Sequence, residues 1–297
     1  MRPNFEFRVP VFRLLIGAVL GVICAEVGGG EPATESASDF VRVSRDDEQE
    51  PQSLDVAIMT FRSNASPDIE VDLVSAVHVG EASYYADLNR RFRDYDAVLY
   101  ELIAPEGTRV DPDAEGPSSL VSMLQGGMTT LLELQFQLDA IDYNRRNMVH
   151  ADMTPKEFER SMHERGESMS QMIMKMWAQS LAKQSNAEST AQEIQLLAAL
   201  LSRDRAGQLK RALAEQFVNM EEMMSLYTDS DGSTLVTERN KKALSVLKQQ
   251  LRRGKQRIAI FYGAGHMSDF AERLENEFDM RRVKTEWIVA WRLNANR

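Results

Sequence analysis

Cysteine is nearly absent from this chain of 297 residues, which contains only Cys24. Cys24 lies inside an apolar run near the N-terminus, so a chain cleaved after that run would contain no cysteine. Such a chain would have neither disulfides nor thiolate chemistry. Any metal would then be held by imidazole and carboxylate side chains.

Several common sequence motifs are also missing. The chain has no Gly-x-Ser-x-Gly nucleophile elbow, no phosphate-binding loop and no dinucleotide-binding fingerprint. Its formal net charge is −10, and its basic residues are interspersed with acidic ones. Because no segment concentrates positive charge for phosphates, we expect no nucleic-acid partner.

The N-terminal residues have the features of a secretory signal. Arg2, Arg8 and Arg13 are followed by the uncharged run 14–25, in the order of a charged region and an apolar region. The run is shorter than the roughly 20 apolar residues of a membrane-spanning helix, although an uncleaved signal would hold the protein at a membrane. A buried helix is the alternative. We therefore expect residues 1–25 to be a signal peptide or membrane anchor on an exported protein that is periplasmic, secreted or membrane-anchored.

Residues 26–53 are rich in Gly, Pro, Ser and acidic side chains and offer little to bury. This composition predicts a disordered linker. The folded domain is then expected to span residues 54–297, which is enough for one core or a core with a subdomain.

Strand patterns occur near both ends of this domain. Residues 54–62 and 69–77 are alternating, β-branched runs around a turn, which predicts a hairpin. A helix over 82–95 and a strand over 97–103 follow, so the second hairpin strand begins a βαβ unit with two parallel neighbours. The pattern recurs at the C-terminus, where a strand (257–262), a helix (267–278) and a strand (283–293) are predicted.

Residues 118–226, between the two halves, are almost entirely helix-forming. Thr154-Pro155-Lys156-Glu157 has the capping threonine, first-turn proline and glutamate of a capping box. The predicted fold is α/β, with a mixed sheet built from two βαβ-like halves and a large helical insertion.

His78 and His266 occupy equivalent places, each between a strand and a helix. His78 stands in Ser-Ala-Val-His and His266 in Gly-Ala-Gly-His, where glycine permits close backbone approach. Ligands of open α/β sheets bind at the carboxyl ends of the strands. A structural role is the ordinary explanation for either histidine alone, but the pair indicates a shared polar or metal site.

Glu101 ends an otherwise apolar strand, where a charged carboxylate is costly without a cation, a metal or several donors. Its structural alternative is an ion pair with Arg239. At 100° per residue, Asn240 falls on the apolar stripe of its helix and Arg239 at its edge, while Glu238 points away. Arg239 and Asn240 are therefore favoured over Glu238 as site residues.

His150 and Asp152 precede the capped helix and are further candidate ligands. A local turn and helix cap explain them equally well.

Four motifs, SAVHVG, YDAVLYE, TERN and FYGAGHM, resemble in sequence and order those of the TraB/TIKI family, also called TraB, PrgY and GumN proteins. The resemblance covers both α/β halves and leaves the helical middle unmatched. It implies a metal-dependent protease acting outside the cell, in which His78, Glu101 and His266 are the metal or catalytic residues and Arg239 is the arginine of the Glu-Arg-Asn motif. Ser75 departs from the pattern because it replaces the glycine of the first Gly-x-x-His motif.

The favoured hypothesis is a hydrolase that binds a divalent cation, with Mn, Co or Zn suited, and cleaves an amide or ester in a peptide or small molecule. Glu101, Arg239 and Asn240 would be its catalytic residues, the last two binding the developing oxyanion or orienting substrate. The alternatives are a non-catalytic protein that binds a peptide signal or haem in the same cleft, and an inactive structural member of the family.

Overall fold

The computed structural model describes residues 39–108, 110, 132–168, 205–226 and 232–294. The expected signal or anchor at 1–25 lies outside these residues. Among the helices that are described, none is long and apolar enough to cross a membrane.

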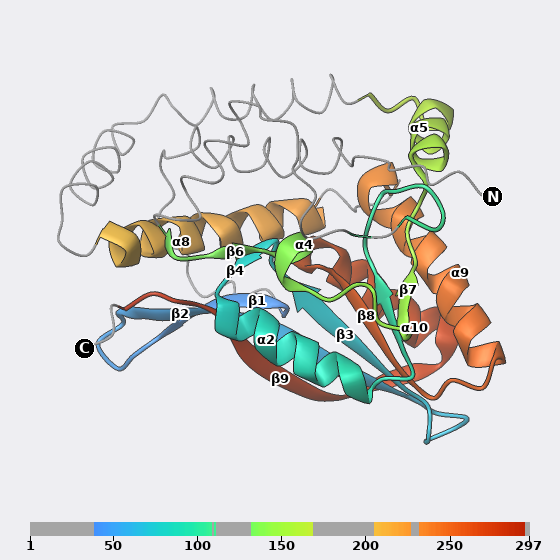
Figure 1. The fold of residues 1–297 in the computed structure, drawn as a ribbon, viewed down its shortest axis with the longest axis horizontal. Helices are drawn as coiled ribbons and strands as arrows, with labels where there is room; N and C mark the ends of the chain where they lie inside the picture. The colour runs from blue at the N-terminus through green and yellow to red at the C-terminus, as the bar shows by residue number, and fades with distance from the viewer. Residues whose placement is uncertain (1–38, 109, 111–131, 169–204, 227–231, 295–297) are drawn as a thin grey trace.

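A mixed sheet of seven strands forms the centre of the domain (Figure 1). The strands pair in the order β1-β2-β3-β8-β5-β7. Strand β1 pairs with the first half of β2 and β3 with its second half, while β9 pairs with β2 over almost its whole length. The strands are β1 (Val41–Arg45), β2 (Pro51–Ser63), β3 (Glu70–Ala76), β5 (Ala97–Tyr100), β7 (Met148–His150), β8 (Arg257–Gly263) and β9 (Met280–Arg292).

The predicted hairpin is confirmed, because β2 pairs with β3 in antiparallel register, with Ile58 opposite Val74. The predicted neighbour relation after it is wrong. Strands β3 and β5, joined through helix α2 (Ala82–Arg91), both pair in parallel with β8, which lies between them. Six of the seven β8 residues are buried, and a strand buried on both faces requires a partner on each side.

The C-terminal unit is also interleaved with the first. Strand β8, helix α10 (Met267–Phe278) and strand β9 follow each other in the chain, yet β3 and β2 lie between the two strands. The two predicted halves therefore share one sheet and are not separate blocks within it.

The folded domain begins earlier than the predicted Leu54. Strand β1 lies inside the segment expected to be a disordered linker, and β2 starts at Pro51. Phe40 and Val41 are buried, at 4% and 0% exposure, and Val41 pairs with Val56. A short apolar group in a polar segment is thus ordered by sheet pairing.

The segment 118–226 is helical in part. It contains α4 (Gln137–Ala140), α5 (Pro155–Glu164) and α8 (Arg205–Leu226). The expectation of helix throughout is wrong, because β7 joins the main sheet and β6 (Gln135–Phe136) pairs with β4 (Val79–Gly80). Residues 118–131 and 169–204 lie outside the described part of the chain.

The predicted capping box is confirmed at the start of α5. Thr154 Oγ1 accepts a hydrogen bond from the Glu157 backbone N–H at 3.3 Å, and Glu157 Oε2 accepts one from the Thr154 N–H at 2.7 Å. This cap fixes the path of the chain directly after Asp152.

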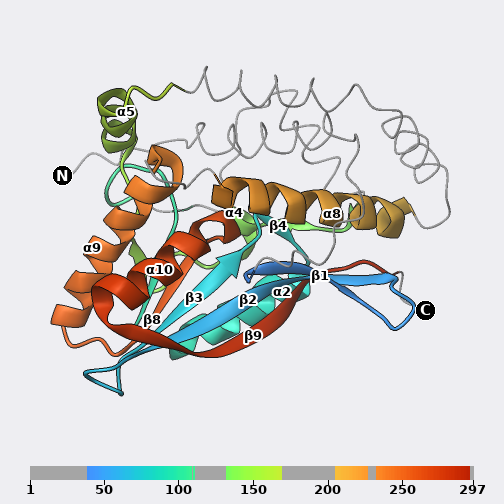
Figure 2. The same ribbon diagram turned by 180° about the vertical axis from the view of Figure 1, so that it is seen from behind.

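Helices cover both faces of the sheet (Figures 1 and 2). Alternate residues along each strand point to opposite faces. Val74 and Phe261 pack in the cluster that contains α2 and α8 residues, whereas Leu73 and Ile260 pack in the cluster of α9 (Arg239–Arg252) and α10. Because β3, β8, β5 and β7 run parallel to one another, their carboxyl ends lie together at one edge of the sheet.

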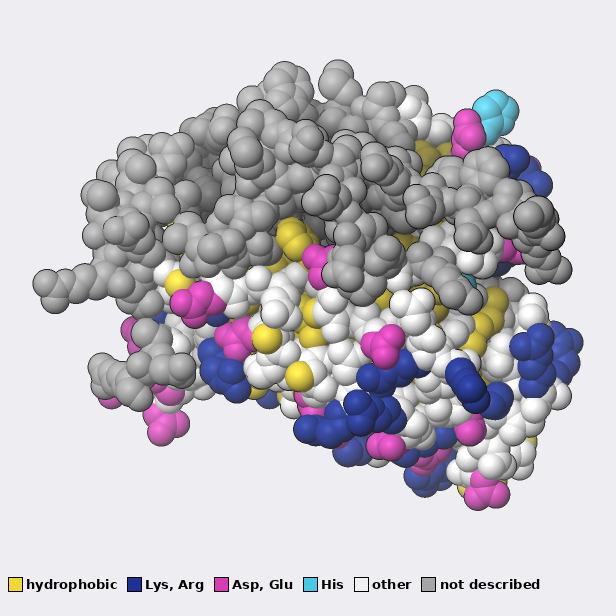
Figure 3. Space-filling model, viewed as in Figure 1, with side chains coloured by type: hydrophobic (Ala, Val, Ile, Leu, Met, Phe, Trp, Pro, Cys, Tyr) yellow, Lys and Arg dark blue, Asp and Glu magenta, His cyan; other side chains and the backbone are white. Residues whose placement is uncertain are grey.

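Basic side chains gather over the lower part of the face shown in Figure 3, with acidic side chains among them. On α2, both Arg90 and Arg91 form ion pairs with Asp87, and Arg91 also pairs with Glu286 on β9 at 2.5 Å. The positive charge of this helix is therefore largely neutralised within the protein.

Ser75 supplies a test of packing in β3. The residue is completely buried, and its Oγ has no hydrogen-bond partner among the described residues. Since an unsatisfied buried hydroxyl costs free energy, Ser75→Ala should raise the free energy of unfolding by about 1 kcal/mol in urea denaturation. The exposed Ser83→Ala should have a much smaller effect. Destabilisation by Ser75→Ala would contradict this account of the hydroxyl.

Candidate functional site

Side chains from separate parts of the sequence meet at the carboxyl edge of the sheet. His78 follows β3, Glu101 follows β5 and His266 follows β8. Gly263 lies among them: a Cβ atom built on Gly263 would be 3.5 Å from Glu101 Oε2, 3.7 Å from His78 Nε2 and 3.9 Å from His266 Cδ2. The absence of a side chain at Gly263 therefore leaves a small space bordered by all three groups.

Glu101 is buried at 5% exposure and both of its oxygens accept hydrogen bonds. Oε1 accepts from Arg239 Nη2 at 2.7 Å, and Oε2 accepts from the Gly263 backbone N–H at 2.8 Å. Burial by itself would raise the pKa of this carboxyl. The charge of Arg239, together with His266, His78 and the Gly263 bond, holds that pKa well below its usual range, so Glu101 is ionised.

Arg239 is held by two carboxylates. Besides Glu101, it donates to Asp152 from Nε to Oδ1 at 2.9 Å and from Nη2 to Oδ2 at 2.5 Å. The bidentate geometry with Asp152 is the strong form of this interaction. The ion pair with Glu101 that the sequence offered as a structural alternative is present, and Asp152 is a second partner. One guanidinium faces two carboxylates, which leaves this buried group with one unit of negative charge.

His266 is oriented by the carboxamide of Asn240. Asn240 Nδ2 donates to the His266 carbonyl at 2.9 Å and to Asp269 Oδ2 at 2.8 Å, so its Oδ1, 2.7 Å from His266 Nδ1, acts as the acceptor. This assigns the proton to Nδ1 and the lone pair to Nε2. Nε2 lies 3.6 Å from Glu101 Oε1 and 3.5 Å from Arg239 Nη1.

The imidazole of His266 is neutral at physiological pH. Burial is the main cause that lowers its pKa to about 4, and the charge of Arg239 lowers it further, against the opposing effect of Glu101. The Nε2 lone pair of this neutral imidazole faces Arg239 Nη1 at 3.5 Å, and a lone pair of this kind can bind a cation or accept a proton.

His78 has a similar arrangement with Gln137. The ring Nδ1 is 3.1 Å from Gln137 Oε1, while Gln137 Nε2 donates to Tyr143 Oη at 2.8 Å and the Gln137 backbone N–H donates to the His78 carbonyl at 2.9 Å. These contacts assign the Nδ1 proton to His78. Gln137 could not be predicted from the sequence, because the pairing of β4 with β6 brings it to His78.

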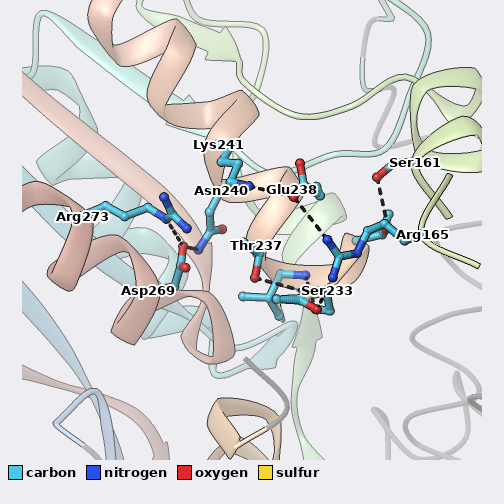
Figure 4. A network of polar contacts seen from close by, with 12 residues as sticks. Ser161, Arg165, Ser233, Thr237, Glu238, Asn240, Lys241, Asp269 and Arg273 are labelled. Atoms are coloured by element: carbon cyan, nitrogen blue, oxygen red, sulfur yellow. Dashed lines mark hydrogen bonds and ion pairs between the residues drawn. The ribbon is translucent and has the colours of Figure 1, made fainter. Parts of the chain in front are cut away.

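The start of α9 places Arg239 and Asn240 together in the interior. A π-helical turn, Thr234–Glu238, precedes α9, and such wider turns are frequent at functional sites. Arg239 and Asn240 are 5% and 0% exposed, whereas Glu238 faces outward and pairs with Lys241 at 2.8 Å (Figure 4). The preference for Arg239 and Asn240 over Glu238 is thus consistent with the side-chain directions.

The two further candidates differ in position. Asp152 is buried and is one of the two carboxylates that pair with Arg239. His150 lies in β7, where its Nε2 is 2.6 Å from the Leu102 carbonyl oxygen and its ring packs 5.7 Å from that of Tyr100. His150 therefore makes its contacts with β5 and the residues after it, and the structure gives it no contact with the histidine pair.

Imidazole nitrogen and carboxylate oxygen are donors that suit a divalent cation. Their present positions, however, do not surround a metal ion. Among the described residues, no group of three or more His, Cys, Asp or Glu side chains is arranged to hold a metal ion. The separation of 3.6 Å between His266 Nε2 and Glu101 Oε1 is close to the roughly 3.4 Å between two tetrahedral zinc ligands. The negative charge of the group and its neutral imidazole also favour a cation.

Comparisons with protein-family models, with curated proteins and with solved structures gave no match to this chain. The likeness to the TraB/TIKI family therefore rests on the four sequence motifs. The structure places the histidines of two of these motifs, the glutamate of another and the arginine and asparagine of the last around one point.

Loss of Arg239 should expose the dependence of the fold on this charge group. Arg239→Met leaves Glu101 and Asp152 buried without their cation, so the free energy of unfolding at pH 7 should fall by about 3 to 5 kcal/mol. Lys242→Met, on the same helix but in a half-exposed pair with Glu157, should cost at most about 1 kcal/mol. Equal losses of unfolding free energy in the two variants, measured by urea denaturation, would show that the buried ion pairs of Arg239 stabilise the fold no more than an exposed pair does.

The neutral state of His266 predicts a pH dependence in metal-free protein. Its pKa is about 4 in the folded state and about 6.5 when unfolded, so protons bind the unfolded chain preferentially between these values. The contribution of neutral His266 to the free energy of unfolding should be fully present above pH 6.5, and the free energy of unfolding should fall by up to about 3 kcal/mol as pH drops to 4. His266→Gln should flatten thermal-melting curves in this window, and the exposed His163→Gln should not. Equal pH dependence in all three proteins would contradict a buried neutral His266.

Proposed function

We propose that this chain is an exported metal-dependent hydrolase that resembles the peptidases of the TraB/TIKI family in its four sequence motifs. The observation that carries the proposal is the convergence of His78, Glu101 and His266 around Gly263. Each imidazole has its Nδ1 against a carboxamide oxygen, an arrangement that orients the opposite nitrogen of metal-binding histidines.

His78, Glu101 and His266 are the residues that would hold the cation, with Mn, Co and Zn all compatible with imidazole and carboxylate donors. When bound, the cation would polarise a water molecule for attack on an amide or ester. The protein contributes two fixed imidazole tautomers and an ionised carboxylate.

Arg239 and Asn240 have positioning roles in this proposal. Arg239 is already engaged by Glu101 and Asp152, and Asn240 by His266 and Asp269. The Nε and Nη2 groups of Arg239 and both ends of the Asn240 carboxamide are thus committed to partners within the protein. We therefore assign Arg239 to holding Glu101 in place and Asn240 to holding His266, in place of the oxyanion role inferred from the sequence.

A non-catalytic binding protein is the second candidate. The same imidazole pair could bind haem or a peptide signal without chemistry, and the ion pair between Glu101 and Arg239 gives this candidate specific support, because a carboxylate so neutralised is a weaker base.

Metal retention and hydrolysis test the proposal together. Gly263→Ala should place a methyl group in the space beside Glu101, His78 and His266 at ordinary contact distances, and the Gly263 backbone, at φ −53°, accepts alanine. The variant should therefore fold normally, lose at least about tenfold in Zn²⁺ or Mn²⁺ affinity, and lose cleavage of a quenched-fluorescence peptide library.

The control is His163→Ala, which removes an exposed imidazole on α5 and should change neither property. Protein purified without chelator should contain metal. A parent chain that retains metal without hydrolysis would favour the binding protein, and one that binds no metal would overturn the proposed function.

A further inference from the structure

Helix α10 carries a row of charged side chains along one face. Asp269, Arg273 and Glu277 follow one another at intervals of four residues, which places them on the same side of the helix. Arg273 Nε donates a hydrogen bond to Asp269 Oδ2 at 2.9 Å, and Arg273 Nη1 donates one to Glu277 Oε1 at 2.6 Å. The row begins at Asp269, three residues after His266 in the chain.

Asn240 connects this row to the imidazole of His266 (Figure 4). Asp269 Oδ2 accepts a hydrogen bond from Asn240 Nδ2 at 2.8 Å, and Asn240 Oδ1 lies 2.7 Å from His266 Nδ1. The Asp269 side chain is 13% exposed, whereas Asn240 is completely buried. A continuous path of hydrogen bonds therefore runs from the surface of α10 to the buried imidazole.

The orientation of the Asn240 carboxamide decides which nitrogen of His266 carries the proton. A carboxamide has an acceptor at one end and donors at the other. If Asn240 were turned over, its oxygen would face the Asp269 carboxylate and the His266 carbonyl oxygen, and both of these groups only accept. Its NH₂ group would then face Nδ1, so the imidazole proton would have to move to Nε2.

Asp269 supplies the stronger of the two constraints on this orientation. A hydrogen bond to an ionised acceptor is roughly twice as strong as one between neutral groups, and the other acceptor of Asn240 Nδ2 is the neutral His266 carbonyl. Arg273 pairs with the same carboxylate oxygen that Asn240 contacts, which holds Asp269 in the rotamer that reaches Asn240.

We propose that Asp269 is a positioning residue, which sets the tautomer of His266 by orienting the Asn240 carboxamide. Asp269 thereby keeps the lone pair on Nε2, the nitrogen that would bind the cation. Supporting carboxylates of this kind are important to metal-binding histidines in general. The consequence for metal binding rests on the proposed function, whereas the tautomer of His266 does not.

Nitrogen-15 NMR of the metal-free full chain, labelled at its histidine nitrogens, tests the tautomer. The His266→Gln variant identifies the signals of His266, which should carry its proton on Nδ1 in the parent chain. Asp269→Ala should fold, because alanine suits a helix, and it removes the charged acceptor. The ratio of the Nε2-protonated form to the Nδ1-protonated form should then rise at least about tenfold.

Two further variants show whether the acceptor is responsible. Asp269→Asn keeps an oxygen that can accept from Asn240 and should restore most of the parent ratio. Glu272→Ala removes an exposed carboxylate from the same helix and should leave the ratio unchanged. The proposal is overturned if the ratio is the same in the parent and in Asp269→Ala, or if either of the other two variants shifts it as far as Asp269→Ala does.

Zinc titration separates this proposal from the proposed function. In a parent chain that binds Zn²⁺, Asp269→Ala should weaken the affinity about tenfold and Glu272→Ala should not change it. An unchanged affinity in Asp269→Ala would contradict the link between the tautomer and the metal. If the parent chain binds no Zn²⁺ or Mn²⁺, the proposed function fails, while the tautomer ratio still decides the role of Asp269.

Discussion

The buried fork of Arg239 between Glu101 and Asp152 supports much of this structure. It joins the ends of two neighbouring strands, β5 and β7, to the first residue of α9. Taking three charges out of water is costly, and the cost is offset only where the geometry is good and the remaining bonding positions are filled. Here the bidentate contact with Asp152 and the Gly263 N–H on Glu101 meet that requirement.

The two histidines depend on this fork in different ways. His266 is tied to α9 through Asn240, the residue next to Arg239, so the helix start that positions the guanidinium also sets the imidazole tautomer. His78 is oriented by Gln137, far away in the sequence and held by its contact with Tyr143. Preorganised donors of this kind require a supporting network around them, which explains the number of buried polar groups at this edge of the sheet.

Sequence reasoning went furthest where a local pattern has one structural outcome. The hairpin of β2 and β3, the capping box at Thr154 and the outward direction of Glu238 each follow from nearby residues. It failed where partners come from elsewhere in the chain. The positions of β1 and β7, the insertion of β8 between β3 and β5, and the role of Gln137 all depend on pairing across long sequence separations.

The sequence by itself determined an α/β domain, the residue types available for chemistry and the exclusion of thiolates from the folded part, because these follow from composition and periodicity. Only the tertiary structure decided which groups meet. Strand order brings Glu101 between Arg239 and Gly263, and this contact converts a carboxylate that could have been a free base into a buried, ionised partner. The reason is physical: a side chain's charge state is set by its neighbours and its burial, and neither is encoded locally.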